Sequence, residues 1–107
     1  MIINGIEFAF DTAKLEDLDR YEEAYTVLQP AIEQGDRLMS EGKLGTAART
    51  YLKAFKEFFC KVAGEDLLGD SVDYNLCLAL WEDFTTQMAE QKQKTRDTYF
   101  SHKKGRR

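Results

Sequence analysis

The sequence has one histidine and two cysteines, and its side chains of catalytic types show no spacing that catalysis requires. The single histidine, His102, belongs to a basic C-terminal stretch and is expected to be solvated. Neither a Ser-His-Asp nor a Cys-His arrangement is therefore predicted. Cys60 and Cys77 match no zinc-binding spacing, so we expect two free, partly buried thiols in a reducing cytoplasm.

Carboxylates gather in the stretch 65–73, where a metal site could form. A calcium loop needs carboxylates at alternate positions, a glycine at the sixth and a glutamate at the twelfth, and this stretch fails that pattern. We expect its acids to cap a helix instead. The adjacent acids Glu22-Glu23 and Glu82-Asp83 diverge by about 100° on a helix, so neither pair forms a catalytic dyad. The sequence therefore predicts no metal, no cofactor and no enzymatic activity.

The stretch 47–62 carries the strongest pattern in the chain. Its large apolar residues recur at steps of three and four, which predicts a helix with an aromatic face that other elements must cover. Two more rings, on a later predicted helix, are expected to lie opposite that face. The main interpretation is a hydrophobic core; the alternative is that part of the face forms a groove for an apolar helix of a partner. The candidate partner-binding rings are Phe55, Phe58, Phe59, Trp81 and Phe84.

Charge divides the chain at residue 91. Residues 1–91 contain 18 acidic and 8 basic side chains, a net charge of −10, whereas residues 92–107 contain one acid and seven bases, a net charge of +6. We therefore expect an acidic hairpin-and-helix body, residues 1–91, and a basic C-terminal tail, residues 92–107. The tail is predicted to extend the last helix and then to become disordered.

The basic tail has two functional interpretations besides that of a solubilising end. It could bind nucleic acid through phosphate contacts. It could instead bind an acidic protein surface, including the body of a neighbouring copy. The acidic body disfavours nucleic acid, because like charges repel. The candidate contact residues are Lys103, Lys104, Arg106 and Arg107.

Residues 1–10 are predicted to form a β-hairpin. Asn4-Gly5 is typical of a tight type I′ turn, and apolar side chains alternate with other types after it. An isolated hairpin is marginally stable in water, so this one must lie on the helices or pair with another chain. Its unpaired strand edge is a candidate association surface, formed by Ile2, Ile6 and Phe8.

Three helices are predicted after the hairpin. The first is capped by Asp11 or Thr12 and carries an apolar stripe from Leu15 to Met39. Pro30 lies within that stripe, and an interior proline removes a hydrogen bond and clashes one turn back. The helix is therefore expected to be kinked at Pro30 or divided into two nearly collinear segments.

The second predicted helix is capped by Thr46 and ends at Gly64. The third is capped by Asp70 or Ser71, and its apolar stripe fades after Met88, so it is expected to be long and to project from the body. The fold class is thus mainly α, with an N-terminal β-hairpin followed by a three-helix bundle in one domain. No transmembrane segment or signal peptide is expected.

Three segments of the chain carry a resemblance to known proteins. They are residues 2–11, 55–70 and 74–84, reading IINGIEFAFD, FKEFFCKVAGEDLLGD and YNLCLALWEDF. Together they resemble small prophage-encoded tail-module proteins of Gram-positive gut bacteria, in which an aromatic helix precedes a glycine-bounded loop and a further helix. The matching positions are Phe55, Phe58, Phe59, Gly64, Glu65, Gly69, Asn75, Leu76, Leu78, Glu82, Asp83 and Phe84.

This resemblance implies a function in phage tail assembly. Small acidic helical proteins of such modules resemble tail-assembly chaperones, which cover the apolar helices of the tape-measure protein and often have a longer, frameshifted form. Lys103-Lys104-Gly105 could be encoded by a slippery run that permits such a frameshift. The expected partner is a tape-measure or other tail protein, with possible homo-oligomers, no membrane, and a location in the bacterial cytoplasm. Two alternatives stay open: a structural tail-completion or connector subunit of the virion, and a nucleic-acid-binding regulator acting through the basic tail.

Overall fold

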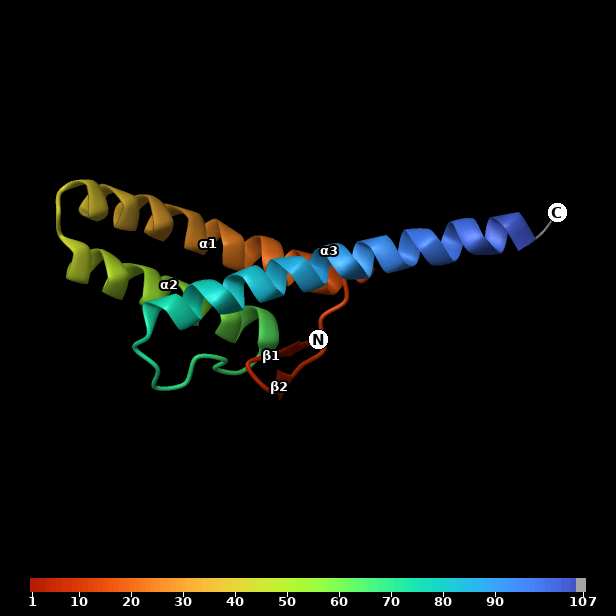
Figure 1. Ribbon diagram of the computed structural model, residues 1–107, viewed down its shortest axis with the longest axis horizontal. Helices are drawn as coiled ribbons and strands as arrows, with labels where there is room; N and C mark the ends of the chain where they lie inside the picture. The colour runs from red at the N-terminus through yellow and green to blue at the C-terminus, as the bar shows by residue number, and fades with distance from the viewer. Residues whose placement is uncertain (106–107) are drawn as a thin grey trace.

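The computed structural model describes the backbone of residues 1–105 and the side chains of residues 1–101. The chain forms strands β1 (Ile2–Ile3) and β2 (Ile6–Glu7), followed by helices α1 (Leu15–Ser40), α2 (Leu44–Ala63) and α3 (Tyr74–Gly105). This confirms the mainly α class, with an N-terminal hairpin and three helices of which the third is long (Figure 1). The molecule is elongated, measuring 61 × 26 × 23 Å, because α3 extends past the other elements. None of the helices in residues 1–105 is both long enough and apolar enough to cross a membrane.

The hairpin has the predicted turn and lies against the helices. Strands β1 and β2 are antiparallel, and Asn4 and Gly5 between them have φ values of 52° and 76°, as a type I′ turn requires. Asn4 Nδ2 donates a hydrogen bond to the carbonyl of Leu67 at 2.9 Å, and Gln87 Nε2 of α3 donates to the carbonyl of Ile2 at 2.8 Å. The side chain of Ile3 is fully buried. Tertiary contacts therefore supply the stability that a two-stranded hairpin lacks alone.

Helices α1 and α2 form an antiparallel pair joined by a tight turn at residues 41–43 (Figure 1). Helix α1 runs through Pro30 as a single element, so of the two expected forms the divided helix is wrong. Farther along, Gly35 is buried against the ring of Tyr51 on α2. Helix α2 ends, as predicted, at Gly64, whose φ of 79° is the left-handed conformation that favours glycine.

The predicted caps of the first two helices are wrong. Helix α1 begins at Leu15 with no side-chain cap, and Asp11 instead accepts the amide of Ala13 at 2.8 Å in the turn before it. Thr46 lies within α2, which begins at Leu44, also without a side-chain cap. Cap preference marks where a helix can begin, but here the N-cap positions lie two or three residues after α1's predicted caps and three residues before α2's, and Asp11 uses its carboxylate in a local turn.

The predicted cap of α3 is also wrong, by two or three residues. Asp73 Oδ1 accepts the backbone amides of Asn75 at 2.9 Å and Leu76 at 3.2 Å, which is the geometry of a helix N-cap. Asp70 and Ser71 lie in the preceding loop. Another loop acid expected to cap the helix, Asp66, instead accepts amides within the loop and forms an ion pair with Lys56 at 3.2 Å.

Helix α3 has a packed half and a projecting half. Its first half buries Cys77, Leu80 and Phe84 against the other elements. Gln91 is the last described residue of α3 with a hydrogen bond to the body: its amide nitrogen donates to the carbonyl of Phe10 at 2.9 Å, and its Oε1 accepts the amide of Thr12 at 3.0 Å. Lys92, Thr95 and Arg96 still line a surface hollow with Thr12 and Ala13. From residue 92 to residue 101 every side chain is exposed. The helix continues to Gly105, so it remains ordered well into the basic tail; residues 106 and 107 lie outside the described part of the chain.

Candidate functional site

The five candidate partner-binding rings lie close together and pack mainly against one another. Phe55, Phe58, Phe59 and Phe84 are buried, and Trp81 is half-buried. The ring of Phe58 lies 5.5 Å from that of Phe59, 5.3 Å from that of Trp81 and 5.7 Å from that of Phe84, mostly edge to face. These distances are typical of favourable aromatic packing in a core. Phe58 also lines a hollow between α1 and α2, whereas no such opening is described at Phe55, Phe59 and Phe84.

The candidate strand-edge residues lie in different environments. Phe8 is buried, Ile6 is half-buried and the side chain of Ile2 is exposed. The outward-facing carbonyl of Ile2 accepts its hydrogen bond from Gln87 of α3. The edge of β1 is therefore partly covered by this molecule's own helix, and each strand offers only two residues for pairing.

The candidate tail residues fall largely outside the described structure. Nothing is described for the side chains of Lys103 and Lys104 or for any part of Arg106 and Arg107. The described part of the tail presents the exposed cations of Lys92, Lys94 and Arg96. It also exposes two rings near its end, those of Tyr99 and Phe100.

An apolar groove, which we call the α1–α2 groove, lies between the first two helices. Its floor consists of the buried side chains of Ala24, Leu28, Ala54 and Phe58, and its volume is about 220 Å³. Alanine side chains are too short to fill the space between two helix axes 8–10 Å apart, which is why a hollow remains. Val27 forms part of the rim and is 61% exposed, an unusual degree for a valine beside an apolar hollow.

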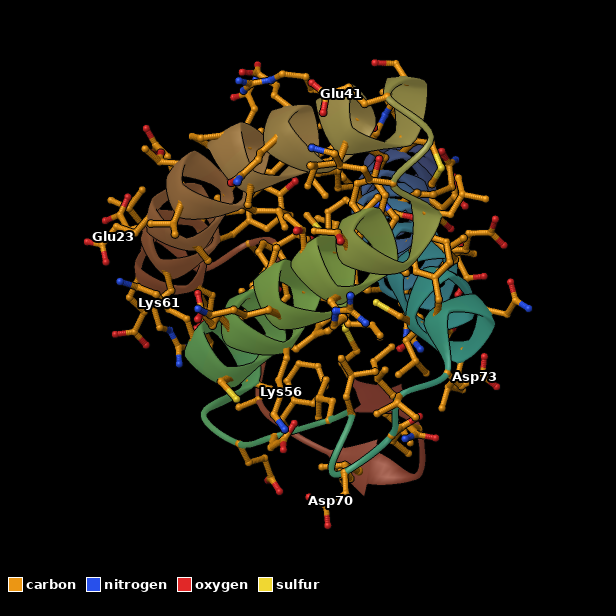
Figure 2. All side chains as sticks on the ribbon, turned by 90° about the vertical axis from the view of Figure 1, so that its left-hand side faces the viewer. Glu23, Glu41, Lys56, Lys61, Asp70 and Asp73 are labelled. Carbon is orange, nitrogen blue, oxygen red and sulfur yellow. The ribbon has the colours of Figure 1, made fainter. Side chains whose placement is uncertain are left out.

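Charged side chains border the α1–α2 groove on the side away from α3. Glu57 and Lys61 line it, and Lys61 Nζ lies 3.1 Å from Glu23 Oε2 across the two helices. Figure 2 shows Glu23 and Lys61 together on the opposite side of α2 from α3. Asp19 and Glu22 lie close to Glu23 on the same helix. The groove is therefore apolar at its floor and mainly acidic along one border.

The sequence analysis did not predict this groove, because it assigned the large apolar residues of α1 to one stripe and did not consider the alanines. Tyr25 keeps helical spacing within the stripe from Leu15 to Met39, but it is exposed and its neighbour Ala24 is buried. A usable pattern was present: Ala24, Leu28 and Ala31 repeat at steps of four and three, and Val27 stands beside them. Small residues at helical spacing mark a close or hollow helix contact, whereas large ones mark a filled core.

Two titratable groups of the body, Asp17 and Tyr51, have shifted pKa values and make hydrogen bonds within the fold. Burial opposes ionisation of Asp17, but the backbone amide of Asp11 and the guanidinium of Arg20 outweigh it, and the pKa of Asp17 is lowered. Tyr51 donates a hydrogen bond to the carboxylate of Asp36, which together with burial raises the pKa of Tyr51 to about 12. Each of these groups is therefore held in the protonation state in which it makes its hydrogen bond.

Neither thiol is activated for nucleophilic chemistry. Burial raises the pKa of Cys77 to about 11, and burial followed by the charge of Asp66 raises that of Cys60. A cysteine nucleophile needs the opposite shift. Both cysteines are free, and within the residues that the structure describes no three metal-ligating side chains converge.

In a comparison with known protein families, a family model matches residues 4–107, a span that includes both the groove and the basic tail. The matching family is described as a family of unknown function, DUF6673. The chain belongs to this family. Neither the curated proteins nor the solved structures with which the chain was compared gave a match.

Proposed function

We propose that this DUF6673 protein is a non-catalytic assembly factor that binds an apolar helix of a client in the α1–α2 groove. The observation that carries the proposal is the unfilled apolar hollow beside Val27, on a face that no other described element covers. Its volume of about 220 Å³ is below the ~300–1,000 Å³ of small-molecule sites. It suits one or two side chains of a helix laid along the two existing helices, as in helix-in-groove recognition.

The client that we propose is a tape-measure or other phage tail protein. Support for this client comes from the resemblance of residues 2–11, 55–70 and 74–84 to prophage tail-module proteins. The net charge of −10 on residues 1–91 would keep a complex with an apolar client soluble. The chaperone role is thus assigned to a face of the body that is already open, and the aromatic core stays closed during binding.

A pull-down of tape-measure protein with the purified chain tests this function. Val27→Asp places a charge in the apolar rim at an exposed helix position, so it should leave the fold intact and reduce client retention at least about tenfold. Val72→Asp is the matched control, because Val72 is 86% exposed and lies before α3, away from the groove. Failure of the wild-type chain to retain the client, or equal loss in both variants, would contradict the proposal.

A structural subunit of the tail is the second candidate. The projecting half of α3, exposed from residue 92 to residue 101, favours it, because permanent subunits often use such an arm to reach a neighbour. The two functions differ in one observable. A structural subunit stays in purified particles, whereas an assembly factor is absent from them.

A further inference from the structure

The projecting half of α3 is mainly basic and carries two adjacent aromatic residues, Tyr99 and Phe100, which we call the apolar tip. Tyr99 is 61% and Phe100 is 49% exposed, and their rings contact each other edge to face at 5.4 Å. Two adjacent exposed rings on a helix of charged residues are costly in water and mark a contact surface. The α3 helix is continuous and carries this tip away from its own body (Figure 1). The rings therefore cannot reach the groove of the same molecule.

The charge of this helix is opposite to that of the groove border. Residues 92–107 carry a net charge of +6, whereas Glu57 lines the α1–α2 groove and Glu23 lies at its border beside Lys61, with Asp19 and Glu22 farther round α1. The bases near that border are already engaged: Lys61 pairs with Glu23, and Arg20 pairs with Asp17. The border therefore keeps an excess of negative charge that a basic helix can neutralise.

The spacing of charge and apolar side chain matches on the two surfaces. On α3, Arg96 precedes Tyr99 and Phe100 by three and four residues, which is about 5–6 Å along the helix. On α1, Glu23 precedes Val27 by four residues, about 6 Å. With the two helices parallel, a ring seated over Val27 brings Arg96 beside Glu23.

We propose that the projecting half of α3 docks in the α1–α2 groove of a second copy of this chain. The rings of Tyr99 and Phe100 cover Val27, and Arg96 pairs with the acidic border at Glu23. Because the two surfaces are different patches, the contact is heterologous; two copies can exchange helices to form a closed dimer, or the contact can continue into a larger assembly. This inference does not depend on the proposed client, since the protein alone contains both surfaces.

Sedimentation velocity of the full-length chain, without any client, tests the proposal. We expect concentration-dependent self-association that weakens as salt is raised from low to moderate concentration. Arg96→Glu should weaken it at least about tenfold, because an attractive pair becomes a repulsive one. Lys94→Glu is the matched control: it makes the same charge change, but two residues along the helix, on nearly the opposite face, and should have an effect of about threefold or less.

A charge exchange and an apolar variant separate this contact from general charge attraction. Because Glu23 pairs with Lys61, the charge exchange reverses both of these residues: Glu23→Lys with Lys61→Glu, added to Arg96→Glu, should recover most of the association that the single Arg96→Glu loses. Tyr99→Ala with Phe100→Ala should weaken association at all salt concentrations, and circular dichroism checks that each variant stays helical. The proposal is overturned by a monomer at every concentration, by equal effects of Arg96→Glu and Lys94→Glu, or by absence of recovery in the charge exchange. Tight binding of DNA by a chain that stays monomeric would overturn it too, and would assign the tail to nucleic acid.

Discussion

At the scale of single residues, Gly35 and Tyr51 hold α1 and α2 together at close range. A Cβ atom built on Gly35 would lie 2.8 Å from Cδ1 of the Tyr51 ring, nearer than carbon atoms can approach. That ring cannot move aside easily, because its hydroxyl donates to Asp36 and its face stacks on Tyr74 at a centroid distance of 5.5 Å. The glycine is thus required by packing, although its φ is ordinary.

Gly35→Ala should therefore destabilise the protein, against the usual trend for a glycine inside a helix. Alanine normally stabilises a helix interior by up to about 1 kcal/mol, but overpacking of this site should reverse the sign and cost about 1–3 kcal/mol. Gly45→Ala is the control, because its Cβ would meet only the guanidinium of Arg49 at 3.8 Å. Urea unfolding of both variants measures the difference. An increase in stability for Gly35→Ala would show that the two helices are not packed this closely.

Asp17 gives a second prediction, with a pH dependence. Its carboxylate is buried and holds the amide of Asp11 and the guanidinium of Arg20, so Asp17→Ala should lower the free energy of unfolding at pH 7 by about 1.5–3 kcal/mol. The pKa of Asp17 is lower in the folded state, so its contribution is complete above the unfolded pKa of about 3.9 and disappears as the pH falls through the folded pKa. The difference between the wild type and Asp17→Ala should therefore shrink below about pH 4. Asp19→Ala, at an exposed position on the same turn, should change stability by less than about 0.5 kcal/mol at pH 7.

At the scale of elements, the start of α3 depends on one side chain. Asp73 accepts two amides of the first turn, so Asp73→Ala should cost about 1 kcal/mol. Asp70→Ala should cost much less, because no hydrogen bond joins Asp70 to the helix among those the structure describes. Thermal unfolding followed by circular dichroism compares the two. A larger effect at Asp70 would move the helix start back to the position that the sequence suggested.

The sequence predicted the existence and order of these elements better than their ends. The Asn4-Gly5 turn and the Gly64 helix end were predictable because positive φ has a strong residue preference. The aromatic face of α2 was predictable because large apolar residues at steps of three and four indicate one face of a helix and no other regular structure. The caps were not predictable, because several short polar residues compete near each helix start and some of them, such as Asp11, accept amides in local turns instead.

The candidate site was less predictable than the fold for a related reason. Periodicity shows which apolar side chains share one face of a helix. It does not show whether they fill the space between that helix and its neighbour. Phe59 and Phe84 were candidates for an open groove, yet they are buried against each other in the core, and of the candidate rings it is Phe58 that lines the open groove, at its floor. The open groove lies where alanines face each other across α1 and α2. Such a hollow depends on how two helices cross, which residue spacing within one helix cannot give.

At the scale of the whole molecule, an acidic body with an open groove and a basic helical arm are parts of one chain. If the arm of a second copy occupies the groove, a client helix must displace it, and self-association falls as client binds. The exchange would keep an apolar surface covered before the client arrives. Because charge attraction contributes to the arm contact, higher salt should favour the client over the second copy.

The central claim is that partners bind the outer α1–α2 groove while the aromatic core stays closed. Its most direct test is a nuclear magnetic resonance titration of the isotope-labelled chain with an apolar helical segment of a tape-measure protein. Large shifts are expected for the Val27, Ala31 and Glu57 signals, with the backbone amides of α3 unmoved, because α3 stays packed on α2. Large shifts of Trp81 and of the α3 amides, with the groove signals unmoved, would contradict it.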